Sequence, residues 1–276
     1  SVVGFKPSFG RVPVWPASPL MMMEHCGPLA RTVQDVALAF TVMAGSDPRD
    51  GYAIQAPFPD VLSGLGKGVR GLRIGISPDL GVLRVDEEVR RVIATSRKIF
   101  TGLGARVFTV NLDLGGAREV ANRICRPMAA RIQRSLGRQK SRLTNDELIA
   151  SAAVGEKMSA VDFLDAEAER IRFRSLMASF HETYDLLIAP TLSCAPFDVG
   201  HDQPPGWRAS DGEFMSTTTP FDLTGQPAIS VPCGFTPRGG PVGLQIVGPY
   251  GSDALVLRAA RAFERAQPIG RKHPFI

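Results

Sequence analysis

The sequence has few cysteines, and they are far apart. Its 276 residues include only four, at Cys26, Cys125, Cys194 and Cys233, and no two of them form a C-x-x-C pair. Structural zinc sites and disulfide-stapled secreted domains both rely on closely spaced cysteines, so the sequence indicates neither a metal site nor a disulfide framework. Four reduced thiols are typical of a cytoplasmic protein.

Long apolar runs are missing as well. No stretch approaches the roughly 20 apolar residues that a membrane-spanning helix requires. The first residues do not place a basic segment ahead of an apolar one, as a secretory signal does. We therefore expect no membrane association and a cytoplasmic location, although a targeting segment that had been removed would leave no trace here.

The charge is only weakly unbalanced. The 32 Lys and Arg residues exceed the 27 Asp and Glu residues by five. The densest basic run, RIQRSLGRQKSR at 131–142, contains no aromatic residue and matches no recognition motif. We interpret it as the solvated face of a helix, and nucleic acid is not an expected partner.

Hydrophobic periodicity alternates between strand-like and helix-like segments. Apolar alternation predicts strands at 71–77, 105–110, 185–190, 227–232 and 242–248. Helical spacing predicts helices at 31–45, 86–104, 144–153, 159–182 and 251–266. Four of these helices have a residue suited to N-capping near their start: Thr32, Thr144, Ser159 and Ser252.

These segments predict an α/β protein. Residues 71–110 form a strand-helix-strand unit, whereas about 116–183 is strand-poor and rich in helix formers. No low-complexity linker or internal repeat divides the chain. We therefore expect one α/β domain over residues 1–276, with a helical layer at about 116–183.

Glycine and proline mark two turns. Gly4 and Gly10 flank Lys6-Pro7 in the opening segment SVVGFKPSFGRVP, and Gly225-Gln226-Pro227 precedes a predicted strand. Glycine suits tight turns, where a side chain would clash. We interpret both as structural turns beneath a site rather than as the site itself.

Several segments follow one another in the order typical of one enzyme family. They are GFKPSFGRVP, GPLARTVQDVALAFTVMAGSDPRD, YDLLIAPT, and TPFDLTGQPAISVPCG with GPVGLQIVG. From residue 1 to about 265, the chain resembles the C-terminal two thirds of the amidase signature family, which are Ser-dependent hydrolases of linear amides. The resemblance implies a mixed central sheet flanked by helices, truncated at the N-terminus, and no metal or organic cofactor.

The resemblance also implies where the catalytic groups should be. Family members use a Ser-cisSer-Lys triad, with a Lys far upstream and a nucleophilic Ser about a dozen residues before the GFKP motif. Because Gly4 begins that motif, the expected nucleophile precedes Ser1, and we expect no catalytic residue within this chain. Ser8 should instead hydrogen-bond the local backbone, and Lys6 follows the nucleophile, so it is not the family's general base.

Cysteine and histidine offer no convincing replacement. His25 and Cys26 are adjacent, so their side chains diverge in most backbones. Cys194 and Cys233 lie in apolar surroundings typical of buried, inert thiols. We interpret His181 as a residue that stabilises a helix C-terminus.

The segment PLMMMEHCGP occupies a place where relatives often carry Ser-Leu-Asp before Gly-Pro. Three methionines would form an adaptable wall for an apolar or aromatic substrate, and ordinary core packing is an equally open alternative. The candidate substrate contacts are Met21, Met22, Met23, Glu24, His25, Thr217, Thr218 and Phe221, and Trp15 carries the same ambiguity.

Residue 215 bears on the choice of substrate. In amidotransferase subunits, a carboxylate ahead of the motif that aligns with Asp222-Leu223-Thr224-Gly225 holds the amino group of glutamine. Here that place falls on Met215, whose side chain cannot pair with an ammonium group. The sequence therefore disfavours glutamine and favours a less polar amide.

Two main functions stay open. The chain is either the C-terminal portion of an amidase-like hydrolase, which cleaves a carboxamide through an acyl-serine once the missing N-terminal part supplies the triad, or a non-catalytic amidase-like protein that binds a ligand or partner. An amidotransferase subunit is a weaker alternative. Expected partners are a small amide substrate and either a second copy of the chain or a complementing N-terminal segment, because uncovered strand edges favour association.

Overall fold

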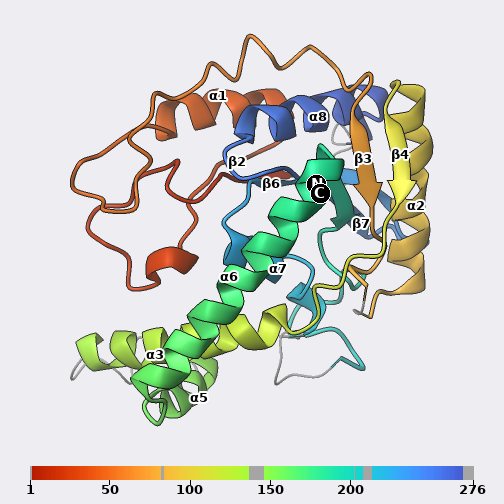
Figure 1. Cartoon of the computed structure of the whole chain (residues 1–276). Helices are drawn as coiled ribbons and strands as arrows, with labels where there is room; N and C mark the ends of the chain where they lie inside the picture. Colours follow the sequence, from red (N-terminus) through yellow and green to blue (C-terminus); the bar gives the residue numbers. More distant parts are fainter. Residues whose placement is uncertain (1, 82–83, 137–145, 202, 208–212, 270–276) are drawn as a thin grey trace.

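A seven-stranded mixed sheet forms the centre of the structure, a computed structural model that describes residues 2–81, 84–136, 146–201, 203–207 and 213–269. The strand order is β2-β1-β6-β7-β5-β3-β4 (Figure 1). β3 runs parallel to both β4 and β5, and the other neighbours are antiparallel. The strands are β1 Val3–Lys6, β2 Leu29–Ala30, β3 Arg73–Ile76, β4 Arg106–Thr109, β5 Leu186–Pro190, β6 Ala228–Phe235 and β7 Pro241–Val247.

Helices cover both faces of this sheet. They are α1 Val33–Met43, α2 Glu87–Gly102, α3 Ala117–Leu136, α5 Asp146–Gly155, α6 Ala160–Thr183, α7 Thr219–Thr224 and α8 Asp253–Ala266. The predicted α/β class, with a mixed sheet flanked by helices, is confirmed. Among the described residues, no helix combines the length and the apolar character needed to cross a bilayer.

The alternation of strand side chains explains the two layers. In β5, Leu186 and Ile188 point to the core shared with α1, α2 and α8, whereas Leu187 and Ala189 point to a second cluster with α6 and α7. Successive side chains of a strand point to opposite faces, so a strand buried on both faces has a continuous apolar sequence. All five residues of β5 are buried.

Three of the predicted caps lie in the described residues. Thr32 accepts a hydrogen bond from the Asp35 amide, and Ser159 forms a reciprocal capping box with Asp162. Ser252 occupies the N-cap position of α8, but its hydroxyl donates to the carbonyl of Pro249 instead. The predicted cap at Thr144 and the end of the basic run, residues 137–142, lie outside the described residues.

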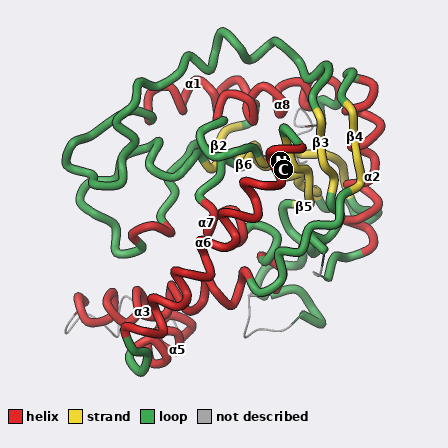
Figure 2. The backbone as a smooth tube through the Cα atoms, in the orientation of Figure 1, coloured by secondary structure: helices red, strands yellow, loops and turns green. Residues whose placement is uncertain are grey.

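The predicted helical stretch at about 116–183 contains α3, α5 and α6; α3 and α5 lie at one end of the molecule, and α6 extends from there across the fold (Figure 2). In contrast, residues 44–72 connect α1 to β3 without a helix or strand, and they run as a long loop around the edge of the fold (Figure 2). This loop matters because it lines the candidate site.

The opening segment is only partly a turn. Val3–Lys6 forms strand β1, which pairs with β2 and β6, and the absence of a side chain at Gly4 lets Leu29 of β2 approach closely. Gly10 is a true turn residue with φ of +80°, and Gly225 has φ of +71° at the end of α7. The prediction of tight turns is therefore correct at Gly10 and Gly225 and wrong at Gly4.

Candidate functional site

A cavity of about 370 Å³ lies beside the segment that follows β1. Its wall combines aromatic and apolar side chains with a few charged groups, and it draws on four separate parts of the chain. The residues that give it its character are Phe9, Met21, Glu24, Asp50, Tyr52 and Arg131. A cavity with apolar walls and few polar groups is suited to a small organic ligand.

The segment with three methionines is divided between this cavity and the core. It forms a single 3-10 turn, which sends successive side chains in different directions. Met21 lines the cavity, whereas Met22 and Met23 pack against the apolar cluster formed by α3, α6 and Leu223. Core packing is therefore observed for Met22 and Met23, whereas a substrate contact by Met21 stays a prediction.

Glu24 is held at the cavity by its neighbours. Its carboxylate accepts a hydrogen bond from the Ser18 hydroxyl at 2.8 Å and a weaker one from the Cys26 thiol at 3.6 Å. Burial and the negative charge of Glu24 raise the pKa of the Cys26 thiol. Cys26 is therefore not an activated nucleophile.

His25 is buried behind the cavity. Its ring packs against Phe9 with centroids 5.5 Å apart, and its Nδ1 lies 3.2 Å from the carbonyl of Met23, which can only accept. We therefore assign the proton to Nδ1. Burial and the positive charge of Lys6 lower the pKa of His25 to about 3, so the ring is neutral at pH 7. Its Nε2 is buried without a hydrogen-bond partner among the described residues.

Two charged residues, Lys6 and Asp222, lie close to His25 and were not proposed as site residues from the sequence. Lys6 Nζ donates to the backbone carbonyl of Gln226 at 2.5 Å, and burial lowers the pKa of Lys6 to about 8 against the attraction of Asp222 and Asp253. Asp222 lies 3.9 Å from His25, and burial raises the pKa of its carboxyl while Lys6 opposes that shift. The signal for Lys6 was its position as the only charged residue among the first ten.

Thr217 and Thr218 come directly before α7 and Phe221 lies within it, and the hydroxyl groups of both threonines are already engaged. Thr217 is buried and donates to the carbonyl of Thr191 at 2.7 Å, and Thr218 donates to the carbonyl of Met215 at 2.9 Å. Phe221 is fully buried between the sheet and α6. None of the three lines the 370 Å³ cavity, so their role as substrate contacts stays a prediction.

Ser8 is tied into the fold. Its amide and its hydroxyl both donate to the carboxylate of Asp253 at 2.8 Å, and its oxygen accepts from the amide of Gly251 at 3.0 Å. Its partners lie more than 240 residues away, so the expectation of a local backbone bond is wrong. The expectation that Ser8 has a structural role is supported by its 2% exposure.

The remaining thiols and His181 show no sign of activation. Burial raises the pKa of Cys194 to about 11 and that of Cys233 to about 12, as expected for inert thiols. His181 contacts the carbonyl of Tyr184 near the end of α6, and burial lowers its pKa. His181 therefore acts as a neutral hydrogen-bond donor rather than as a cation at the helix end. No cluster of three metal-ligating side chains occurs in the described part of the chain.

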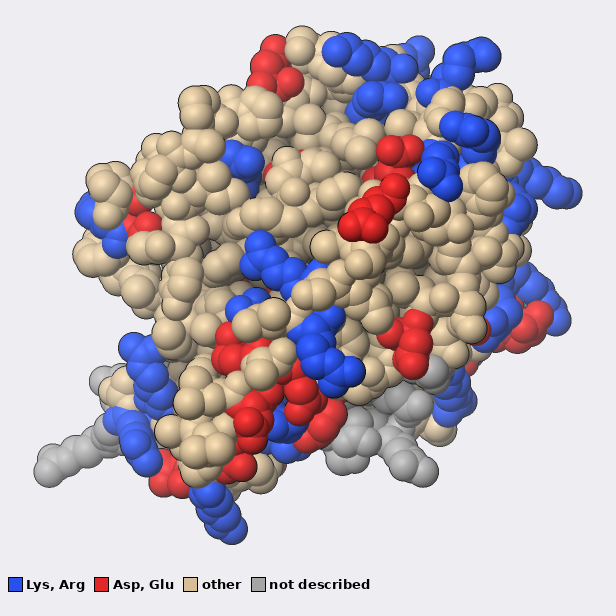
Figure 3. Space-filling model, viewed as in Figure 1, with Lys and Arg blue, Asp and Glu red and all other residues tan. Residues whose placement is uncertain are grey.

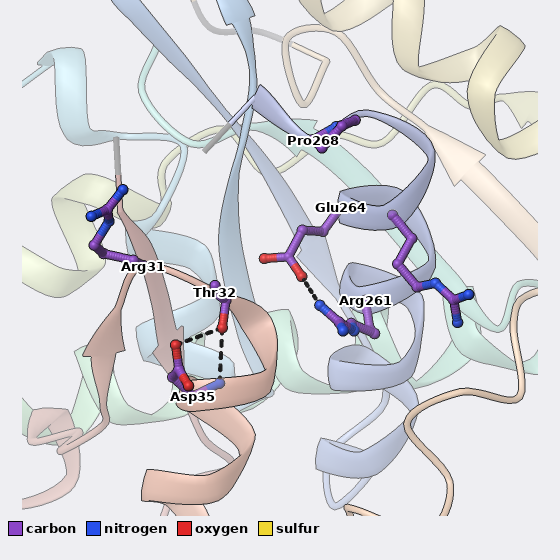
Figure 4. Close-up of a pocket in the computed structure, with 7 residues that line it drawn as sticks. Arg31, Thr32, Asp35, Arg261, Glu264 and Pro268 are labelled. Atoms are coloured by element: carbon purple, nitrogen blue, oxygen red, sulfur yellow. Dashed lines mark hydrogen bonds and ion pairs between the residues drawn. The ribbon is translucent and has the colours of Figure 1, made fainter. Parts of the chain in front are cut away.

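A larger cavity, of about 610 Å³, lies where the start of α1 meets the end of α8 (Figure 4). Its polar groups pair with one another: Thr32 bonds with Asp35, and Arg261 lies 2.5 Å from Glu264 (Figure 4). Glu264 also accepts from the amide of Val33 at 2.8 Å. The bond between Glu264 and Val33 joins α8 to α1, and we assign this cavity a structural role.

Comparison with known proteins identifies the family. A sequence model of the Amidase family matches residues 1–257. An acylamidase of Rhodococcus erythropolis is 35% identical over 99% of this chain and 59% of its own length. A glutamyl-tRNA(Gln) amidotransferase subunit of Rubrobacter xylanophilus is 32% identical over 97% of this chain and 60% of its own length.

The solved structures agree with this assignment. A bacterial aryl acylamidase of the amidase signature family superposes with a TM-score of 0.86 and 30% sequence identity, over 99% of this chain and 61% of its own. The chain thus spans about three fifths of the length of the relatives that it matches. By sequence and by fold, the chain belongs to the Amidase family of amidase signature enzymes.

Proposed function

We propose that this chain is part of an amidase that hydrolyses a carboxamide through an acyl-serine, and that the Ser-cisSer-Lys triad comes from polypeptide outside these 276 residues. The observation that carries the proposal is the state of Ser8. Ser8 directly follows the GFKP motif, and its hydroxyl already donates its proton to Asp253. A nucleophile needs a base that can accept its proton, and a buried carboxylate within a structural network does not supply one.

The reaction is an acyl transfer. The serine oxygen bonds to the amide carbon, the C–N bond breaks as the leaving nitrogen receives a proton, and water then hydrolyses the ester to release the carboxylate. The part of this reaction that we assign to the present chain is the holding of the substrate. The 370 Å³ cavity provides apolar and aromatic walls for the substrate.

The preferred substrate is an amide without a charged amino group near the scissile bond. Met215 is 37% exposed at the end of a 3-10 turn, in the place where amidotransferase subunits carry the carboxylate that holds glutamine. A thioether has no charge to pair with an ammonium group. The amidotransferase function is therefore the weaker candidate, although a relative with that name shares 32% identity.

An activity assay separates these alternatives. The 276-residue chain and the whole protein from its coding region should be compared on a neutral aryl acylamide, an aliphatic amide and glutamine, with release of amine or ammonia as the readout. We expect activity on the neutral amides only, and only when a segment with the triad is present. Mass spectrometry after treatment with a fluorophosphonate should locate the label outside these 276 residues.

Two results would contradict the proposal. Amide hydrolysis by the 276-residue chain that is lost in Ser8→Ala would place the nucleophile within the chain. Binding of neutral amides without turnover by the whole protein would instead support the non-catalytic alternative.

We also assign the protein to the cytoplasm, and the support is that Cys26, Cys125, Cys194 and Cys233 are all free.

A further inference from the structure

Helix α6 has an exposed apolar stripe that its own fold does not use. Val161, Leu164 and Ile171 are 64%, 63% and 57% exposed. Together with small side chains they recur at alternating intervals of three and four residues along the exposed side of the helix. The residues of this outer stripe are Val161, Leu164, Ala168, Ile171, Ser175 and Ala178.

The opposite side of α6 meets the rest of the protein. The residues there recur with the same period and are buried or half-buried, and they are Phe163, Ala166, Arg170, Phe173, Met177 and Phe180. A surface helix ordinarily has one apolar face and one polar face. Since α6 has two apolar faces and the fold covers one of them, the outer stripe is the part to be explained.

The spacing of the outer stripe is that of a coiled-coil seam. Apolar residues that alternate every three and four positions place one continuous line of side chains against a partner helix. The 24 residues of α6 span about 36 Å at 1.5 Å per residue. In Figures 1 and 2, α6 crosses the front of the molecule, and its outward side has no other helix or strand over it among the described residues.

The charges beside the stripe identify the partner. Asp165 is exposed beside its N-terminal half and Arg172 is exposed beside its C-terminal half, whereas Glu167 pairs with Arg170 at 3.0 Å and Arg174 lies over the ring of Tyr250. On the face of the molecule that carries α6, acidic and basic side chains lie next to one another (Figure 3). Asp165 and Arg172 can each meet the other in a second copy of α6 that runs antiparallel, whereas in a parallel pair in the same register each would meet a like charge.

We propose that α6 of one chain pairs antiparallel with α6 of a second copy about a two-fold axis. Ala168 of each chain then faces Ile171 of the other. In the layers on either side of this central pair, Leu164 of one chain faces Ser175 of the other. In this register Asp165 of each chain lies opposite Arg172 of the other, so that each charge contact occurs twice. The small side chains at Ala168 and Ser175 let the two helices approach closely.

This inference does not depend on amide hydrolysis, because it rests on the surface of α6 alone. The other occupant to consider is polypeptide outside these 276 residues. A covering segment would require apolar side chains that match the stripe, but it would not require the charges along α6 to be complementary to α6 itself. The self-complementary charge pattern therefore favours a second copy.

Sedimentation equilibrium over roughly 1 to 100 μM protein tests the pairing, since coiled-coil-like interfaces of moderate size dissociate in that range. We expect the mass to approach twice the 29.7 kDa of the single chain. Leu164→Glu should weaken dimerisation at least a hundredfold because two charges enter the seam. Val42→Glu on α1 is the matched control, since Val42 is 83% exposed and lies away from α6.

A charge swap tests the antiparallel register. Asp165→Arg and Arg172→Asp should each weaken dimerisation about tenfold, because each places like charges opposite one another twice. The double variant should restore dimerisation to within about threefold of the original protein. Circular dichroism should show that every variant keeps its helix content, since the substituted residues are exposed.

Four outcomes would overturn the inference. A chain that stays monomeric at 100 μM excludes the pairing. A dimer that Leu164→Glu leaves intact uses another surface. A dimer that is lost in both single charge variants and also in the double variant lacks the antiparallel register. The same measurements on the whole protein show whether a longer polypeptide covers the stripe, and a monomer there also contradicts the proposal.

Discussion

Asp253 joins the two ends of the described chain, and its replacement by Asn is the sharpest test of the packing around β1. The carboxylate is fully buried at the start of α8 and accepts from the amide and the hydroxyl of Ser8, both at 2.8 Å. Arg11 Nε lies 3.7 Å from the same carboxylate and has no hydrogen-bond partner among the described residues. Asp253→Asn keeps the shape but removes the charge and turns one acceptor into a donor.

The expected cost follows from these contacts. Two charge-assisted hydrogen bonds contribute about 1.5 to 3 kcal/mol each, and Asn can preserve only one of them as a weaker, neutral bond. The variant also leaves the buried Arg11 guanidinium without its counter-charge. We therefore expect Asp253→Asn to lower the free energy of unfolding by about 3 to 5 kcal/mol, the range measured when one partner of a buried ion pair is removed.

Ser8→Ala is the companion variant. It removes the hydroxyl bond but keeps the bond from the Ser8 amide, so its cost should be about half that of Asp253→Asn. Urea unfolding followed by circular dichroism measures both, and the double variant should cost less than the sum of the single variants because the residues are in direct contact. A cost below about 1 kcal/mol for Asp253→Asn would refute the reasoning, because a solvated carboxylate gives that result.

Two further predictions concern the same region. Because burial lowers the pKa of His25 to about 3, the unfolded chain binds a proton between pH 3 and 6.5 that the folded chain does not, so stability rises with pH across that window. His25→Gln should flatten this slope in urea unfolding measured across the same window. Gly10→Ala should cost more than about 2 kcal/mol in urea unfolding, since φ is +80° and a Cβ would lie 2.2 Å from the carbonyl oxygen of Tyr52, whereas Gly51→Ala meets no atom within 4 Å and should be nearly neutral.

The sequence predicted most of the sheet because most strands have distinctive patterns. The segment 185–190 is continuously apolar, and the structure buries all of β5. The end of β6 was missed because Pro232 signals a strand end, yet a register shift between Pro232 and Gly234 lets the strand continue to Phe235. Strand β1 was missed for a similar reason, since Gly4 and Pro7 resemble a loop when the close contact with Leu29 is unknown.

The candidate site was less predictable because its residues meet only in three dimensions. Met21 was proposed from the sequence and lines the cavity, but Asp50 and Tyr52 come from a loop that has no motif, and Arg131 comes from a run interpreted as a solvated helix face. Nothing local in the sequence connects these four positions. Sequence patterns describe neighbours along the chain, whereas a cavity wall depends on how distant segments pack.

Ser8, Lys6 and His25 show why residue type alone does not identify catalytic groups. A hydroxyl, an amine and an imidazole within one region suggest a nucleophile and its bases, but each is already engaged in a different bond. Ser8 donates to Asp253, Lys6 is an ammonium group at pH 7 that donates to the carbonyl of Gln226, and His25 directs its proton to Met23. A base must offer a lone pair to the nucleophile's proton, and among these groups only Nε2 of His25 has a lone pair free. The cluster therefore helps to hold β1 and the residues after it against α8 and the segment that follows α7.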